Sequence, residues 1–206
     1  MCQLLPAVIL RGRHGMRRNI CAFALLFIVS FTGMAHSADM SVFGIELGKP
    51  LVLPKCSSDP LVGNKKMCVR NYWQEFRLYD KKVRIISFGK EVFPAYTRGA
   101  LIPLEIDGNV EGIEIQSGGV SDQESMYQAL CAKYGKPTKV EKTVVKNRIG
   151  AFFDAIDAEW TIGNVYVVMW GVFGALNEGR CTIDTAKGKA LREEWLKSYA
   201  SKVKKI

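Results

Sequence analysis

The chain has 206 residues, with 29 Lys plus Arg against 20 Asp plus Glu, six Cys and two His. With 48% apolar and 24% charged residues, the composition is that of a globular protein and excludes a disordered, collagenous or coiled-coil chain. A chain of this length buries most of its unfolded surface in one core, so we expect residues 39–206 to form one domain.

Residues 1–38 follow the order of a secretory signal sequence. A basic segment at 16–18 precedes the apolar run 20–31, and small residues follow up to Ala38. The run is too short for a permanent membrane-spanning helix, and no charged stop-transfer flank follows it. We therefore expect a periplasmic or secreted protein, cleaved near Ser37 or Ala38 and translated from Met16.

Removal of residues 1–38 leaves 25 Lys plus Arg against 20 acidic residues, and no His. Catalysis by Ser-His-Asp or Cys-His and metal sites with His ligands are thereby excluded for the mature chain. A phosphate-binding loop, a dinucleotide fingerprint and a nucleophile elbow are also missing from the sequence. We expect no catalytic residue, no metal site and no cofactor.

Four cysteines remain after the leader: Cys56, Cys68, Cys131 and Cys181. An even number in an exported chain indicates disulfides, and we favour Cys56–Cys68 and Cys131–Cys181 over the other pairings. The first would close a short loop, and the second would join a helix to a later strand. Their spacing does not favour zinc, and without His nothing activates a catalytic thiol.

The first part of the mature chain is predicted to be extended. Residues 39–60 are rich in Gly and Pro, with a short strand expected at 42–47, and further strands are expected at 69–79 and 83–88. Asp107-Gly108 lies between β-branched runs, which predicts a hairpin of 101–106 and 110–116.

A helix is predicted after Ser121, which forms a capping box with Glu124. Gly135 and Pro137 end it. Its apolar face, read from helical spacing, consists of Met126, Tyr127, Leu130, Cys131 and Tyr134.

The remaining segments predict strands at 138–146, 152–162, 165–173 and 180–184, then a helix from 186 to 204 capped by Asp184 or Thr185. The run 165–173 is apolar on both faces, as in a central strand covered on each side. This order predicts an α+β fold: a mostly antiparallel sheet, stapled by disulfides, with the internal helix and the C-terminal helix packed on one face.

Two segments carry a resemblance. Residues 133–138 read Lys-Tyr-Gly-Lys-Pro-Thr and end the predicted helix, and residues 43–51 precede Cys56. Both resemble elements of small exported bacterial proteins. The pattern is also similar to the helix-then-sheet repeat of outer-membrane assembly lipoproteins and of the secreted β-lactamase inhibitor protein. The chain lacks the lipidated Cys of those lipoproteins, and the resemblance carries over no functional residue.

These observations favour an exported binding protein that catalyses nothing, of inhibitor, immunity or envelope-accessory type. Its partner would be another protein or an envelope component. We expect the loop 93–99 to supply the contact surface through Tyr96 and Arg98, because Tyr and Arg are favoured interface anchors.

The alternative is a carboxylate-based hydrolase of envelope glycans that uses Asp154, Asp157 or Glu159. By strand alternation Asp157 and Glu159 share a face, and Asp154 lies on the other. A solvated strand edge is the favoured interpretation of these residues.

A third class is a peripheral membrane protein. The C-terminal helix carries excess positive charge beside a stripe of Leu191 and Trp195, which suits an anionic surface or an acidic partner. We favour a helix docked on the sheet with its charges in solvent. The contact residues of the membrane alternative are Lys197, Lys202, Lys204 and Lys205.

Aromatic and basic residues alternate between 70 and 79 and would suit the stacking of bases. Strand alternation accounts for them as core and solvent residues, and the expected export disfavours nucleic acid as a partner.

Overall fold

The computed structural model describes residues 41–57, 66–70, 77–78, 81–82, 84–88, 94–98 and 100–203. The expected signal sequence lies outside them, as does most of the aromatic-basic stretch at 70–79. The strands are β1 Ser41–Val42, β2 Ile45–Glu46, β3 Cys68–Arg70, β4 Arg77–Leu78, β5 Lys81–Lys82, β6 Ile85–Ser87, β7 Ala100–Ile106, β8 Asn109–Ser117, β9 Lys139–Lys146, β10 Phe152–Ile162, β11 Val165–Trp170 and β12 Gly179–Thr185. The helices are the short 3-10 turn η1 Gly119–Ser121, α1 Gln123–Tyr134 and α2 Ala186–Val203.

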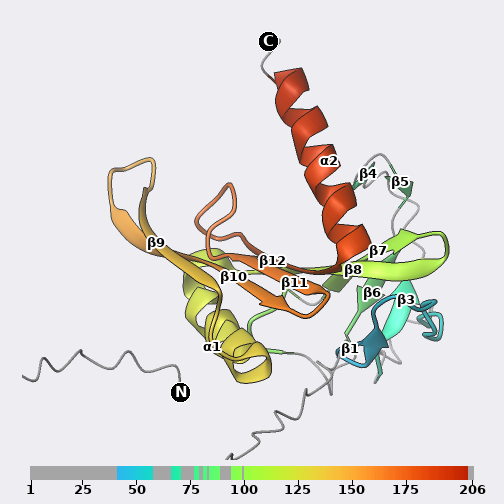
Figure 1. The fold of residues 1–206 in the computed structure, drawn as a ribbon. Helices are drawn as coiled ribbons and strands as arrows, with labels where there is room; N and C mark the ends of the chain where they lie inside the picture. Colours follow the sequence, from blue (N-terminus) through green and yellow to red (C-terminus); the bar gives the residue numbers. More distant parts are fainter. Residues whose placement is uncertain are drawn as a thin grey trace, which may run out of the picture.

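Eight strands form the main sheet, in the order β3-β6-β7-β8-β12-β11-β10-β9 (Figure 1). Each neighbouring pair is antiparallel. The chain builds one half up to β8, crosses through α1 to the far edge at β9, and returns strand by strand until β12 pairs with β8. The predicted α+β class with a mostly antiparallel sheet is confirmed.

The hairpin of β7 and β8 forms where the sequence predicts it. Asp107 and Gly108 both have positive φ, 51° and 83°, which is the backbone that a two-residue turn of this twist requires. A bulge lies between Leu104 and Glu105.

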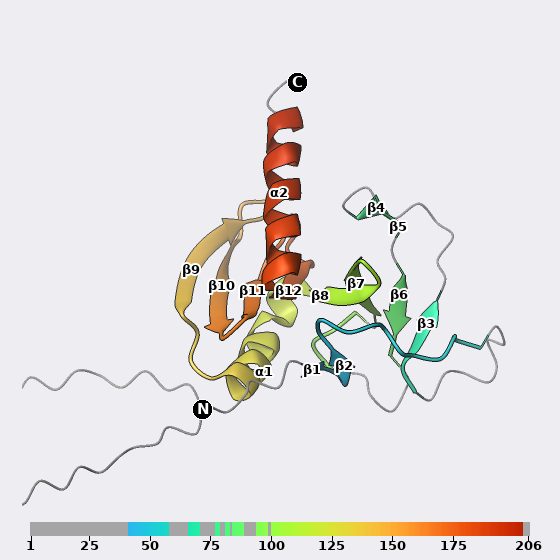
Figure 2. The ribbon, with the colours of Figure 1, turned by 45° about the vertical axis from the view of Figure 1, so that its right-hand side comes forward.

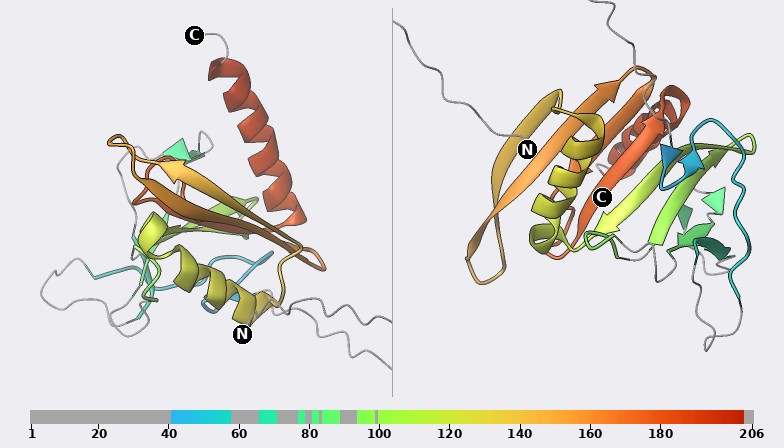
Figure 3. Two further views of the ribbon diagram at one scale, coloured as in Figure 1. Left: turned by 90° about the vertical axis from the view of Figure 1, so that its left-hand side faces the viewer. Right: turned by 90° about the horizontal axis from the view of Figure 1, so that it is seen from below.

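Helices α1 and α2 lie on opposite faces of the sheet, so the expectation that both pack on one face is wrong. Figure 1 shows α1 beneath the sheet and α2 rising from the other side, and the view from below in Figure 3 has α1 in front of the strands. Trp160 belongs to the α1 face: its indole Nε1 donates to the Gly135 carbonyl at 2.9 Å, and its ring lies 6.0 Å from that of Tyr127. Arg192 of α2 instead bonds Asp184, which points to the other face.

Most of the core lies on the α1 face. Its sheet side is built from alternate residues of the central strands, which β pairing brings into register, and its helix side from the predicted apolar stripe of α1. The sheet residues include Ile113, Ile115, Ala158, Trp160, Val165, Val167, Met169, Cys181 and Ile183.

The start of α1 differs from the predicted capping box. Ser121 ends the 3-10 turn, and its hydroxyl contacts Asp122 and the Gly118 carbonyl instead of an amide of the helix. Asp122 occupies the cap position, and its carboxylate accepts from the Gly118 amide at 2.7 Å. The end of the helix is as predicted, with Gly135 at φ 78°.

Cys56 and Cys68 form the predicted disulfide. The predicted Cys131–Cys181 bond is wrong, because the structure has both as buried thiols that are not joined. Helix α1 packs chiefly on β10, and β11 separates β10 from β12. Two strand spacings amount to about 10 Å, which exceeds the separation that a disulfide spans.

Candidate functional site

The α2 face carries a continuous row of side chains that crosses five strands. Pairing places Glu141 opposite Asp157, Asp157 opposite Trp170, Trp170 opposite Arg180, and Arg180 opposite Gln116. Glu141 is exposed and the other four are half-buried. With strands about 4.8 Å apart, this transverse row extends for about 19 Å. It combines an aromatic ring, a cation, an amide and two carboxylates on one open surface.

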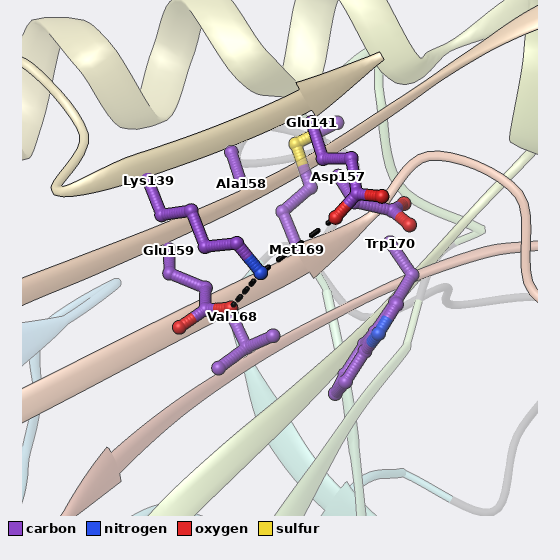
Figure 4. Close-up of a pocket in the computed structure, with 8 residues that line it drawn as sticks. All are labelled: Lys139, Glu141, Asp157, Ala158, Glu159, Val168, Met169 and Trp170. Carbon is purple, nitrogen blue, oxygen red and sulfur yellow. Dashed lines mark ion pairs between the residues drawn. The ribbon is translucent and has the colours of Figure 1, made fainter. Parts of the chain in front are cut away.

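A hollow of about 160 Å³ lies at one end of the transverse row (Figure 4). Its lining includes Glu141, Asp157 and Trp170 of the row, together with Lys139 and Glu159 from the row beside it. The Lys139 ammonium lies 3.6 Å from a carboxylate oxygen of Glu141 and 3.6 Å from one of Glu159. This hairpin-side hollow thus concentrates three carboxylates around a single lysine and a Trp ring.

Asp157 has an environment unlike that of its neighbours. Burial raises the pKa of its carboxyl group, the opposed Glu141 raises it further, and the Gly171 amide, which donates to Asp157 at 3.2 Å, acts against the rise. Glu159 shares the face but is exposed. As predicted, Asp154 lies on the opposite face, where β9 places Val144 beside it.

The other end of the transverse row is a second hollow of about 230 Å³, lined by Arg98, Gln116, Phe173 and Arg180 among others. The Arg180 guanidinium lies 3.7 Å from the centre of the Phe173 ring, and Phe173 makes an edge contact with Trp170 at 5.9 Å. This turn-side hollow is therefore joined to the hairpin-side hollow by an unbroken chain of cation and rings.

Helix α2 is seated beside this row by close contacts in its first half. The Thr185 hydroxyl accepts from the Gly188 amide at 3.2 Å, which confirms Thr185 as the predicted cap. Gly188 lies so near β8 that an added Cβ would come within 2.1 Å of the Glu111 carbonyl oxygen. Lys187 pairs with Asp107 at 2.6 Å. Beyond this seat the helix projects away from the sheet, as Figure 2 shows.

A cluster of four charges holds that seat: Arg192, Asp184 and Glu114 are buried, and Arg180 is half-buried. The Arg192 Nε lies 2.9 and 2.8 Å from the two Asp184 oxygens, and its Nη1 lies 3.4 Å from Glu114. Arg180 approaches Glu114 from the other side at 3.2 Å. Two cations balance two anions, which is the condition under which charges are tolerated away from water. Arg180 thus belongs both to this buried cluster and to the open transverse row.

Of the two residues predicted for partner contact, the structure brings only Arg98 to the site. Arg98 is exposed, lines the turn-side hollow, and donates to the Asn177 carbonyl oxygen. Tyr96 packs against the core, and burial raises the pKa of its hydroxyl. Residues 93 and 99, the ends of the predicted loop, lie outside the described residues.

The predicted membrane-contact lysines are placed only in part. Lys197 is exposed on the projecting half of α2. Lys202 is on the same helix, but the structure does not describe its side chain, and Lys204 and Lys205 lie outside the described residues. Leu196 beside Lys197 is also exposed, and the buried residues described on α2, Gly188 and Arg192, belong to its first half.

No local sequence pattern marks Trp170, Arg180, Gln116 or Arg192 as site residues. The transverse row depends on the pairing of β8 with β12, for which no local pattern exists. One available indication was Glu114, an acid between Ile113 and Ile115 in a predicted strand. A buried carboxylate requires a cation, and Arg192 supplies it.

Within the described residues, no set of three or more His, Cys, Asp or Glu side chains is grouped so as to hold a metal ion. No helix in the described part of the chain is both long enough and apolar enough to cross a membrane. Comparison with models of known protein families, with curated proteins and with solved structures found no match.

Proposed function

We propose that the chain is an exported binding protein that recognises a macromolecular partner across the transverse row and catalyses no reaction. The observation that carries the proposal is the transverse row itself, in which the half-buried Trp170 and Arg180 lie side by side between the two hollows. Trp and Arg are the side chains most often responsible for binding energy at interfaces. Inhibitor, immunity and envelope-accessory roles all fit such a surface.

The shape of the surroundings supports the same function. Helix α2 stands at one side of the row and the hairpin of β9 and β10 curves up at the other (Figure 2). A partner that enters between them would contact both hollows at once. The buried cluster fixes the Arg180 guanidinium before binding, which lowers the conformational entropy lost on association.

The test uses the mature chain as bait in envelope extracts, with bound species identified by mass spectrometry. We expect a species that the wild type retains and that Trp170→Ala and Arg98→Ala each lose, because both residues border the hollows. Val52→Ala is the matched control, since Val52 is an exposed apolar residue elsewhere on the surface. Equal retention by all four baits would refute the proposal.

A second candidate, a carboxylate-based hydrolase of envelope glycans, rests on the contrast between Asp157 and Glu159. A half-buried carboxyl with a raised pKa suits a general acid, and the second, exposed carboxylate on the same face suits the base or nucleophile that this chemistry pairs with it. This reading predicts release of soluble fragments from peptidoglycan, abolished by Asp157→Asn. Asp154→Asn on the opposite face is the matched control and should retain activity. Undigested peptidoglycan with the wild type would eliminate the candidate.

A further inference from the structure

The hairpin of β9 and β10 exposes apolar side chains to an extent unmatched elsewhere in the described residues. Among the described residues, seven large apolar side chains are exposed, and four of them belong to this hairpin: Val140, Val144, Ile149 and Phe152. Ile149 is 91% exposed, Phe152 69% and Val144 64%. Such a concentration on one protruding element indicates a contact surface.

The turn of the hairpin is built to hold Ile149 outward. The Asn147 side-chain oxygen accepts from the Ile149 amide at 3.1 Å and from the Ala151 amide at 2.8 Å. Gly150 has a φ of 92° and donates its amide to the Asn147 carbonyl at 3.1 Å. The Ile149 side chain is thus presented at the extreme end of a fixed turn, without packing against its neighbours.

Cations surround this apolar tip, and acids are missing from it. Residues 142–153 contain Lys142, Lys146 and Arg148 and no Asp or Glu. Lys146 lies cross-strand from Phe152, with its ammonium 5.4 Å from the ring centre. The next acid along β10 is Asp154, beside Val144, and it marks the inner limit of the tip.

We propose that the tip of this hairpin, residues 145–153, inserts into the headgroup region of an anionic lipid bilayer. Ile149 and Phe152 enter the boundary with the acyl chains, and Lys146 and Arg148 contact the lipid phosphates. Long cationic side chains reach back to the headgroup level while their stems stay in apolar surroundings. This combination of apolar and basic residues is typical of interfacial membrane attachment.

The form of the tip favours a bilayer over a protein partner. Figure 1 shows the hairpin extending past α1 at the outer edge of the sheet, so the tip is convex and stands apart from the body. Its few apolar side chains offer on the order of a few hundred Å² of surface, well below the about 800 Å² that each member of a stable dimer buries. A fluid surface accommodates such a tip without needing a matching cavity.

The experiment measures co-sedimentation of the purified protein with phosphatidylcholine vesicles, with and without phosphatidylglycerol. We expect binding to the anionic vesicles that weakens in high salt. Joint replacement Ile149→Ser and Phe152→Ser should weaken it by about tenfold or more, because two exposed side chains lose their burial in lipid. Val52→Ser should bind as the wild type does, since Val52 is 88% exposed but does not belong to the hairpin of β9 and β10.

Two further variants distinguish the hairpin tip from the projecting half of α2 and from the transverse row. A chain shortened after Trp195 and a Trp170→Ala variant should both retain vesicle binding, which keeps the result independent of the projecting helix and of the proposed partner site. Absence of binding to anionic vesicles, or wild-type binding by the double variant, would overturn the proposal. So would loss of binding in the shortened chain, or a dimer in sedimentation equilibrium that the double variant abolishes. Both substituted side chains are exposed, so the thermal midpoint should be unchanged.

Discussion

Replacement of Arg192 by Met should destabilise the fold more than a surface substitution could. Arg192 binds Asp184 through Nε at 2.9 and 2.8 Å and approaches Glu114 at 3.4 Å, and all three side chains are buried. The variant leaves two buried carboxylates with Arg180, at 3.2 Å from Glu114, as the remaining cation of the cluster. Removal of one member of a buried ion pair costs about 3–5 kcal/mol, so we expect a loss of this size in the free energy of unfolding.

The size of this loss should depend on pH. Burial raises the pKa of Asp184, and Arg192 opposes the rise. Without Arg192 the native pKa rises further, while the unfolded value stays at about 3.9. A native pKa above the unfolded one gives stability that is present at low pH and lost as the pH rises. The difference in the free energy of unfolding between wild type and variant should therefore be largest at neutral pH and should decrease as the pH falls toward 4.

Urea unfolding followed by circular dichroism measures both effects. With an m-value of about 2 kcal/mol/M, the expected loss lowers the midpoint by roughly 2 M at neutral pH. Arg192→Met combined with Asp184→Asn should recover part of the stability, because one of the two stranded charges is gone. A loss below about 1 kcal/mol, or one independent of pH, would show that the cluster behaves as an exposed ion pair.

Two further predictions concern the seat of α2 and the disulfide. In an exposed helix Gly→Ala stabilises by about 1 kcal/mol. Gly188→Ala should instead lower the thermal midpoint, because the added Cβ would lie 2.1 Å from the Glu111 carbonyl oxygen. A higher midpoint would contradict the close packing of α2 on β8. Joint replacement of Cys56 and Cys68 by Ala should cost about 3 kcal/mol through the loop that the bond closes over a sequence separation of 12. Urea unfolding of the reduced wild type should show a similar loss in the free energy of unfolding. An unchanged urea midpoint would show that the disulfide does not stabilise the fold.

Local patterns predicted the turn between β7 and β8 and the end of α1, because the causes of both are local, whereas the single strand expected at 42–47 is the pair β1 and β2 joined by a turn at Phe43 and Gly44. Asp107-Gly108 fixes its turn by backbone conformation alone, and Gly135 ends α1 for the same reason. The capping residue of α1 was misassigned because η1 adds a turn of helix ahead of it, and Ser121 and Asp122 are both acceptable caps in sequence. A choice between adjacent capping residues depends on the loop that precedes them.

The site was beyond reach of the sequence because long-range pairing creates it. Strand alternation placed Asp157 and Glu159 on one face correctly, yet it could not bring Arg180 and Gln116 to the same row. The predicted apolar stripe of α2, Leu191 and Trp195, is only half-buried. Among the described side chains of the helix the buried one is that of Arg192, which the sequence pattern assigns to solvent. Only the register between β8 and β12 shows that the buried acids Glu114 and Asp184 lie where Arg192 can pair with both.

The closure of the sheet between β8 and β12 has a consequence for how the chain folds. Every other neighbouring pair among β6 to β12 joins strands that follow one another in sequence, whereas this seam joins distant ones. Its formation loses the most loop entropy, so we expect it to set the pace of folding. Until it closes, each half leaves an unpaired inner edge that the matching edge of another chain can satisfy. At high concentration during refolding, two copies can therefore exchange halves and give an intertwined dimer in which each strand keeps its native neighbour.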